Sequence, residues 1–223
     1  MSRCAAIAAL ALLLSGCGTL SDIAGRVARL TAPVSLAPDD RLTLAMRDPV
    51  QCQAILREQG VAFTPARDQT DGEFCVVTNA VLLGDAPVRM SPARTMMNCP
   101  LAAGLLLWSR HSVEPAAREL LGAGISQLDH YGVYACRRVN GQAEGRPSAH
   151  ARAEALDVAA FRLSNGRRVS VEADWPRQTP EAAFLRRVRD DACKVFGSVL
   201  SPDYNALHHN HLHLEAGGRG PCS

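Results

Sequence analysis

Two short stretches of this chain concentrate residues that commonly bind metal ions. Five of its seven histidines lie in residues 148–157 and 208–213: His150, His208, His209, His211 and His213. The first stretch also contains Asp157. Imidazoles together with one carboxylate form the ligand set that a catalytic zinc prefers when one coordination position must stay open. These stretches therefore make a metal-centred hydrolase the first hypothesis.

The spacing in both stretches favours convergence of the side chains. Residues 211–215 alternate polar and apolar, so a strand here puts His211, His213 and Glu215 on one face at steps of roughly 7 Å. His150 lies in a loop before an expected strand that begins at Asp157, and a turn between them can bring the two together. Surface histidines on a polar edge are the alternative interpretation, but the clustering favours a metal site.

Helices and strands that alternate irregularly are expected around these residues. Apolar periodicity and capping residues predict helices from Pro49 to Gly60, at 99–108, at 114–121 and from Thr179 onward. Alternation predicts strands at 61–63, 75–83, 132–139, 157–163, 167–173 and 211–215. Asn165-Gly166 between two of these strands indicates a hairpin. This succession indicates an α+β domain with a mainly antiparallel central sheet flanked by helices.

Charge and length restrict the classes of partner. The 24 Lys and Arg residues nearly balance the 22 Asp and Glu residues, which leaves a net charge of +2. This balance predicts neither nucleic-acid binding nor a polybasic membrane patch. The length suits a single domain after an N-terminal leader, and we expect a monomer.

The first residues have the character of an export signal. Arg3 is followed by an apolar run from Ala5 to Leu14 and then by small residues, a run too short to cross a bilayer as a mature helix. Leu14-Ser15-Gly16-Cys17 resembles a bacterial lipobox, whose cysteine is acylated. We therefore expect a signal peptide over 1–16, a lipid on Cys17 that anchors the protein to a membrane, and a flexible tether over 17–45. A secreted protein without a lipid is the alternative.

Six cysteines remain after Cys4 and Cys17 are assigned to the leader and the anchor: Cys52, Cys75, Cys99, Cys136, Cys193 and Cys222. An even number in an exported chain indicates disulfide bonds. The absence of a Cys-x-x-Cys pair argues against a thiolate metal site. Pairing of sequence neighbours would join Cys52 to Cys75, Cys99 to Cys136 and Cys193 to Cys222, which is one of many connectivities that six cysteines allow.

Both histidine stretches resemble motifs of known zinc enzymes. Ser148-x-His150-x-x-Ala153-x-Ala155-x-Asp157 is similar to the Ser-x-His-x-x-Gly-x-Ala-x-Asp signature of zinc D-Ala-D-Ala peptidases. His211-x-His213 is similar to the second motif of their clan, which also contains lysostaphin-type peptidases and the hedgehog signalling domain. From about Cys52 to Cys222 the chain resembles the bacterial extensin-like C-terminal domain family. The matching pieces are Tyr134–Arg137, Ala155–Ala159, Asp174-Trp175 and Pro202–Asn205.

The resemblance implies a hedgehog/DD-peptidase-like fold over residues 46–223 and roles for individual residues. It implies His150, Asp157 and His213 as zinc ligands, with His211 beside the zinc-bound water. His208 occupies a place where some clan members have a further active-site histidine. Arg137 matches an arginine that contacts substrate in the peptidases.

The chemistry of the residues themselves adds three expectations. Arg137 suits a bidentate grip on a terminal carboxylate or the stabilisation of an oxyanion, and a structural ion pair is the equal alternative. Glu215 can be an outer partner of a ligand imidazole or a solvated edge carboxylate. Ser148 is expected next to the ligands as part of the first motif.

The chain departs from the family patterns at two points. Ala153 replaces the glycine of the first motif, which matters if the backbone is strained there. The Glu-x-x-His form of the second motif, which supplies a carboxylate base in the dipeptidases, is missing. The proton acceptor must therefore be a histidine such as His211 or lie elsewhere.

These observations lead to a functional expectation and one alternative. We expect a lipid-anchored protein that hydrolyses peptidoglycan peptide bonds next to a D-amino acid with zinc-activated water. Gly18 after the lipid cysteine, together with the distribution of the family, favours the periplasmic side of a Gram-negative outer membrane. The alternative is a non-catalytic module that binds peptidoglycan or a partner protein and keeps the zinc site.

Overall fold

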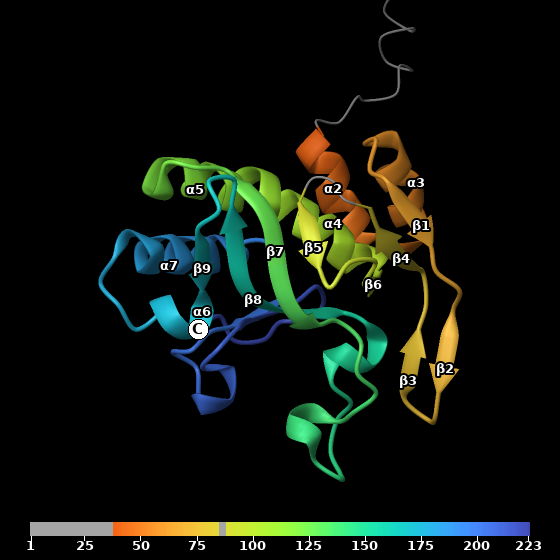
Figure 1. Ribbon diagram of the computed structural model, residues 1–223. Coiled ribbons are helices and arrows are strands. Elements are labelled where there is room, and N and C mark those ends of the chain that lie inside the picture. The colour runs from red at the N-terminus through yellow and green to blue at the C-terminus, as the bar shows by residue number, and fades with distance from the viewer. Residues whose placement is uncertain (1–37, 85–87) are drawn as a thin grey trace, which may run out of the picture. The chain divides into compact units, whose positions relative to one another are not determined.

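The computed structural model describes residues 38–84 and 88–223 (Figure 1). The expected signal peptide, Cys17 and most of the expected tether lie outside the described residues. Within the described part of the chain, no helix combines the length and the apolar character needed to cross a membrane.

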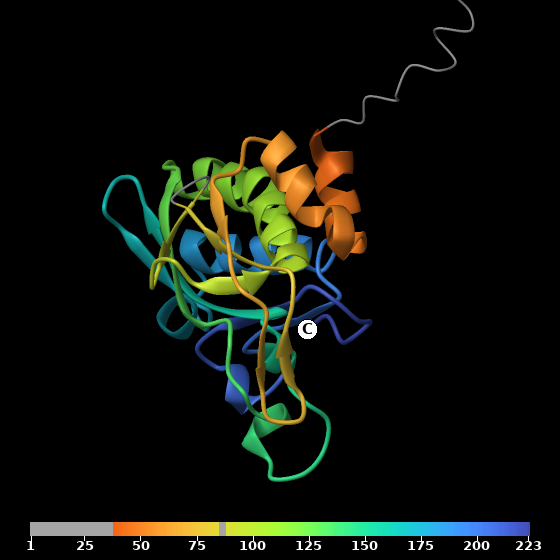
Figure 2. The ribbon, with the colours of Figure 1, turned by 90° about the vertical axis from the view of Figure 1, so that its right-hand side faces the viewer.

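The described chain forms helices and three sheets (Figures 1 and 2). The helices are α2 (Pro38–Arg47), α3 (Pro49–Glu58), α4 (Cys99–Trp108), a π-helical turn η1 (Ser109–Val113), α5 (Glu114–Leu121), α6 (Val171–Asp174) and α7 (Pro180–Ala192). Three 3-10 turns are η2 (Val139–Gly141), η3 (Ala149–Arg152) and η4 (Ala206–His208). The strands are β1 (Phe63–Pro65), β2 (Gln69–Asp71), β3 (Cys75–Val77), β4 (Ala80–Leu83), β5 (Arg89–Ser91), β6 (Met96–Asn98), β7 (Ile125–Gly132), β8 (Ala155–Leu163), β9 (Arg168–Ser170), β10 (Ser198–Leu200) and β11 (Leu212–Glu215).

The largest sheet has the strand order β10-β11-β8-β7-β5, with β9 also paired to β8. Its pairs are antiparallel except for β5 and β7. Strands β1, β4 and β6 form a second antiparallel sheet, and β2 and β3 form a separate antiparallel pair. The expected α+β class with a mainly antiparallel sheet is confirmed.

Helices α4 and α7 pack against the same side of strand β8. The Trp108 ring of α4 lies 6.0 Å from the Phe161 ring of β8, which lies 5.1 Å from the Phe184 ring of α7. All three side chains are fully buried. Because α4 is almost entirely apolar, it can only be stable as such a covered helix. Helix α7 begins as expected, with Thr179 as its N-cap and Pro180 in its first turn.

Two irregularities in the pairing of β7 with β8 lie next to Asp157. One extra residue, Ala159, interrupts β8, and another, Tyr131, interrupts β7 before Gly132 pairs with Asp157. Such bulges bend a strand and change which side of the sheet its residues face. They therefore set the direction of the side chains at this end of the sheet.

Two expectations about elements are wrong, and a third is correct only in part. Of the strand expected at 167–173, β9 covers Arg168–Ser170 and helix α6 begins at Val171. The tether was expected to extend to residue 45, but α2 begins at Pro38, and Leu42 and Ala45, one helical turn apart, are fully buried. The strand expected at 132–139 does not form, because β7 ends at Gly132. The backbone of residues 133–138 instead bonds to the turn that carries His150, as described below.

The disulfide bonds join Cys52 to Cys99, Cys75 to Cys136 and Cys193 to Cys222. The expected pairs Cys52–Cys75 and Cys99–Cys136 are wrong, and only Cys193–Cys222 is confirmed. The reason is tertiary packing. Helices α3 and α4 pack together, and this contact places Cys52 beside the first residue of α4.

Candidate metal centre

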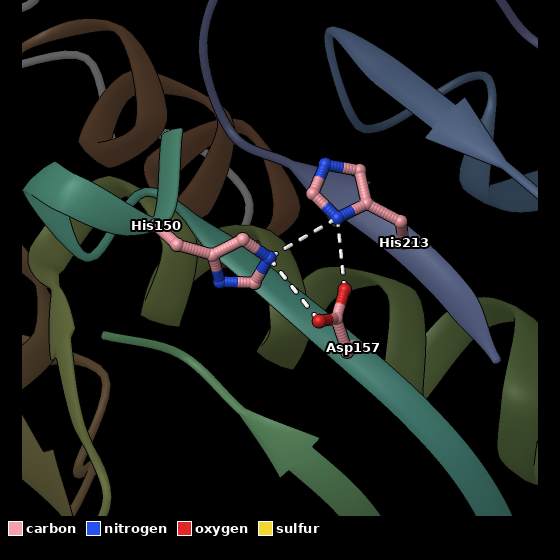
Figure 3. Close-up of side chains that lie close together, drawn as sticks. All are labelled: His150, Asp157 and His213. Atoms are coloured by element: carbon pink, nitrogen blue, oxygen red, sulfur yellow. Dashed lines mark hydrogen bonds and ion pairs between the residues drawn. The ribbon is translucent and has the colours of Figure 1, made fainter. Parts of the chain in front are cut away.

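Three side chains converge where β8 and β11 pair beside η3 (Figure 3). His150, Asp157 and His213 each offer one ligand atom, and these atoms all lie within 4.8 Å of one another. Asp157 Oδ2 lies 3.2 Å from His150 Nε2, and Asp157 Oδ1 lies 2.8 Å from His213 Nδ1. The two histidine nitrogens are 3.3 Å apart. Asp157 and His213 oppose each other directly in the register of the two strands.

A short turn and one backbone carbonyl hold His150. Ser148 caps η3, and its Oγ accepts a hydrogen bond from the His150 backbone N–H at 3.3 Å. The side-chain Nδ1 of His150 lies 2.8 Å from the carbonyl oxygen of Val133. Because a carbonyl only accepts hydrogen bonds, Nδ1 carries the proton and donates it. The lone pair of Nε2 therefore faces Asp157, as a metal ligand requires.

His213 lies between two carboxylates. Its Nδ1 faces Asp157, and its Nε2 lies 2.9 Å from Glu215 Oε1. Burial alone would lower the pKa of His213, but hydrogen bonds to Asp157 and Glu215 and their negative charges raise it to about 9. Glu215 thus lies where an outer partner of a ligand imidazole was expected, a common feature of zinc sites.

Both carboxylates of this group are held in their ionised form. Burial opposes ionisation of Asp157, but its interactions with the His150 and His213 rings outweigh it and lower the pKa of Asp157 strongly. Burial also opposes ionisation of Glu215, and its hydrogen bond with His213 lowers its pKa. The site therefore offers an anionic ligand and an anionic outer partner at neutral pH.

His211 and His208 lie beside the three converging residues. His211 Nε2 is 3.5 Å from Asp157 Oδ1, and the His208 ring is 5.1 Å from the His211 ring. Burial lowers the pKa of His211, and the neighbouring His213 lowers it further against the opposing effect of Asp157. Burial, then repulsion from His211 and His213, lowers the pKa of His208 to about 4. Both imidazoles are therefore neutral at pH 7.

The protonated nitrogen of each neutral imidazole follows from its partner. His211 Nδ1 lies 2.8 Å from Asn210 Oδ1, and His208 Nδ1 lies 2.8 Å from Asn205 Oδ1. Amide oxygens accept hydrogen bonds, so both Nδ1 atoms donate. The Nε2 atom of His211, on the side of Asp157, is left as a proton acceptor.

Arg137 lies in the irregular segment after β7 and not at the end of a strand. Its side chain is exposed, and its positive charge contributes to the low pKa of His208. No carboxylate in residues 38–84 and 88–223 forms an ion pair with it. The geometry therefore leaves this guanidinium available to an anionic group near the histidines.

Two tyrosines next to the histidines were not identified as site residues from the sequence. The Tyr131 ring lies 6.0 Å from the His211 ring, and the Tyr204 ring lies 5.6 Å from the His208 ring. These side chains are exposed by 58% and 44%. Tyr204 could have been identified, because it belongs to the Pro202–Asn205 piece that carries the family resemblance. No sequence pattern pointed to Tyr131, because its position depends on the bulge in β7.

The donor set fits a zinc ion. Two histidine nitrogens and one carboxylate oxygen are the ligands of zinc sites that keep one position open. Each histidine also has the outer hydrogen bond that such ligands need, His150 to the Val133 carbonyl and His213 to Glu215.

Ala153 ends η3 in the left-handed conformation, with φ +53° and ψ +33°. This conformation costs an L-residue about 1–2 kcal/mol but costs glycine little. Ala153→Gly should relieve this strain and lose a fully buried methyl worth roughly 0.8 kcal/mol. We expect its free energy of unfolding, measured in urea, to stay within about 1 kcal/mol of the parent value.

Ala151→Gly is the matched control, because Ala151 is equally buried in the same turn without a positive φ. It should lose about 1–2 kcal/mol, since it removes a methyl and adds backbone freedom without relieving strain. Equal losses for the two glycine variants would show that Ala153 is not strained.

Comparison with known proteins identifies the family. Searches of curated proteins and of solved structures gave no match. The sequence model described as Extensin-like protein C-terminus matches residues 50–223, which is more than half of the chain and includes the whole candidate site. The chain therefore belongs to the extensin-like protein C-terminus family.

Proposed function

We propose that this protein is a zinc-dependent hydrolase of peptidoglycan peptides that cuts an amide next to a D-amino acid. The observation that carries the proposal is the convergence of His150, Asp157 and His213, each held by partners suited to a zinc ligand. The resemblance of both motifs to zinc D-Ala-D-Ala peptidases supports the substrate class and a place in their clan, with a hedgehog/DD-peptidase-like fold.

The location is part of the same proposal. The apolar run and the lipobox-like sequence that ends at Cys17 support export and a lipid anchor, and the proposed protein is a monomer. We place it on the periplasmic side of a Gram-negative envelope, in the outer membrane. The disulfide bonds suit that oxidising compartment.

The residues around the ligands have distinct roles in this reaction. When bound, zinc supplies a Lewis acid that activates water and polarises the scissile carbonyl. His211 accepts a proton at Nε2 and returns it to the leaving amine, since it is neutral at pH 7 and donates through Nδ1 to Asn210. Arg137 binds the terminal carboxylate of the peptide or the developing oxyanion. His208 provides a second neutral imidazole, which lies beside His211.

A non-catalytic module that binds peptidoglycan and retains zinc is the second candidate. One observation favours it. The two carboxylates next to His213 are already engaged, Asp157 among the ligands and Glu215 with His213 Nε2. Proton transfer therefore depends on the neutral imidazoles beside the ligands, those of His211 and His208.

Cleavage of purified peptidoglycan fragments by the zinc-loaded protein distinguishes the two candidates. We expect new peptide termini in mass spectra, and we expect His211→Ala to slow their formation by about 100-fold or more while zinc remains bound. The control is His209→Ala, because His209 is exposed and its Nδ1 bonds locally to the Ala206 carbonyl. Absence of cleavage by protein with stoichiometric zinc would contradict the enzyme and favour the binding module.

A further inference from the structure

The Cys75–Cys136 disulfide joins two parts of the chain that share no sheet. Cys75 is the first residue of β3, in the isolated β2–β3 pair, and it is fully buried. Cys136 is exposed and lies in the irregular segment 133–138 that follows β7. Figures 1 and 2 both show the β2–β3 pair beside the loop that follows β7.

The residues on either side of Cys136 hold the turn that carries His150. The Ala135 N–H donates to the His150 carbonyl oxygen at 3.1 Å, and the Arg137 carbonyl accepts from the Ser148 N–H at 3.1 Å. Three residues before Cys136, the Val133 carbonyl accepts from His150 Nδ1 at 2.8 Å. Segment 133–137 thus fixes both the backbone of His150 and the direction of its ring.

Other contacts hold the ends of this segment, and the exposed Cys136 lies between them. Val133 is buried in the core with Tyr134 packed against it, and the Arg138 guanidinium lies 4.6 Å from the centroid of the Phe74 ring. The pairing of β7 ends at Gly132, and beyond Cys136 the chain makes an isolated bridge between Arg138 and Pro147. Most of residues 139–147 are exposed. Strand β3 also contacts η3 directly. The disulfide therefore joins β3 and segment 133–137, which both contact the His150 turn.

We propose that the Cys75–Cys136 disulfide is a positioning element for His150, so that the affinity of the metal centre depends on whether this bond is oxidised. The inference rests on the proposed zinc site. A dithiol or phosphine reductant would deliver two electrons to the S–S bond. The bond then breaks, both sulfurs take up a proton to become thiols, and the dithiol becomes a disulfide or the phosphine a phosphine oxide, with oxygen from water. Binding free energies are reciprocal. Zinc must therefore lower the equilibrium constant for reduction of this disulfide by the same factor by which the disulfide raises the affinity for zinc.

Paired substitutions test the proposal in the full chain. The variant Cys75→Ala/Cys136→Ala should bind zinc at least tenfold more weakly in competition with a chelator. Its cobalt-loaded form should have a changed visible absorption spectrum, because the geometry of one ligand is altered. The matched control is Cys193→Ala/Cys222→Ala, which removes a disulfide whose neighbours make no bond to His150, Asp157 or His213. Its zinc affinity and cobalt spectrum should match those of the parent.

The outcomes distinguish failure of the proposed positioning role from failure of the proposed zinc site. If the parent protein binds no zinc, the proposed metal centre fails. If the parent and both folded variants bind zinc equally, the centre stands and the positioning role is overturned.

A second measurement covers a variant that does not fold. The parent protein is equilibrated in glutathione redox buffers, in which two glutathione thiols reduce the disulfide and become glutathione disulfide, and the free cysteines are alkylated and quantified by mass spectrometry. Saturating zinc should raise the ratio of reduced to oxidised glutathione that half-reduces Cys136 at least tenfold and leave the ratio for Cys222 unchanged. An equal ratio for Cys136 with and without zinc would overturn the proposal.

Discussion

Asp157→Asn should abolish stoichiometric zinc binding and leave the protein folded. Asp157 supplies the negative charge that faces both histidine nitrogens, and the neutral amide removes this charge with almost no change of shape. Loss of an outer partner typically costs a metal site 10- to 100-fold in affinity. Loss of the anionic ligand should therefore cost more, on the order of a thousandfold. Zinc affinity by chelator competition and zinc content by elemental analysis measure the effect.

Asp129→Asn provides the matched control. Asp129 lies on the neighbouring strand β7 and is buried to nearly the same extent, with its side chain 14% exposed against 15% for Asp157. It pairs with Arg162 and Arg168 and not with the histidines. Its substitution should change stability but not zinc content. An Asp157→Asn variant that keeps one tightly bound zinc would show that the ligand assignment is wrong.

The centre could be anticipated from the sequence because its main determinants are local. His213 and Glu215 share a face through the two-residue period of one strand, and η3 closes over the few residues between His150 and β8. Helices α4, α5 and α7 could also be predicted from the sequence, because their apolar residues, terminal residues and prolines act within one or two helical turns.

The features that were missed depend on contacts between distant parts of the chain. The partners of Cys52 and Cys75 follow from the packing of α3 on α4 and of β3 on η3, which sequence neighbours do not reveal. The Val133 carbonyl that orients His150 is a backbone group and has no side-chain signature. The exposed position of Tyr131 comes from a bulge, which is a property of two paired strands and not of one.

Zinc binding should release about one proton from His213 at pH 7.5. In the metal-free protein, burial disfavours the charged ring, but Asp157 and Glu215 outweigh it and raise its pKa to about 9. His213 is therefore protonated on Nδ1, the nitrogen that must be free to bind the metal. The apparent zinc affinity should fall roughly tenfold for each pH unit below 9, or about a hundredfold between pH 9 and pH 7. Calorimetry in two buffers with different ionisation enthalpies counts the released protons.

The same protonation makes the stability of the metal-free protein depend on pH. The pKa of His213 is raised from about 6.5 in the unfolded chain to about 9 in the folded protein. The resulting stabilisation, about 3 kcal/mol, is fully present below pH 6.5 while the carboxylates stay ionised, and it is lost as pH rises to 9. With saturating zinc, His213 is neutral throughout this range, so its contribution to stability should not change. Urea unfolding at pH 6.5 and pH 9, with and without zinc, measures this contrast.

Glu215→Gln tests whether the carboxylates cause this behaviour. It removes one of the two charges that hold the proton on His213, so the pKa of His213 should fall and fewer protons should be released at pH 7.5. Glu181→Gln is the control, because Glu181 lies on α7 and pairs with Arg167. Zinc binding without proton release in the parent protein would mean that His213 is not protonated in the metal-free protein or does not bind the metal. The pH dependence therefore tests whether His213 exchanges its proton for the metal while its side chain is intact, which the loss of a whole side chain cannot do.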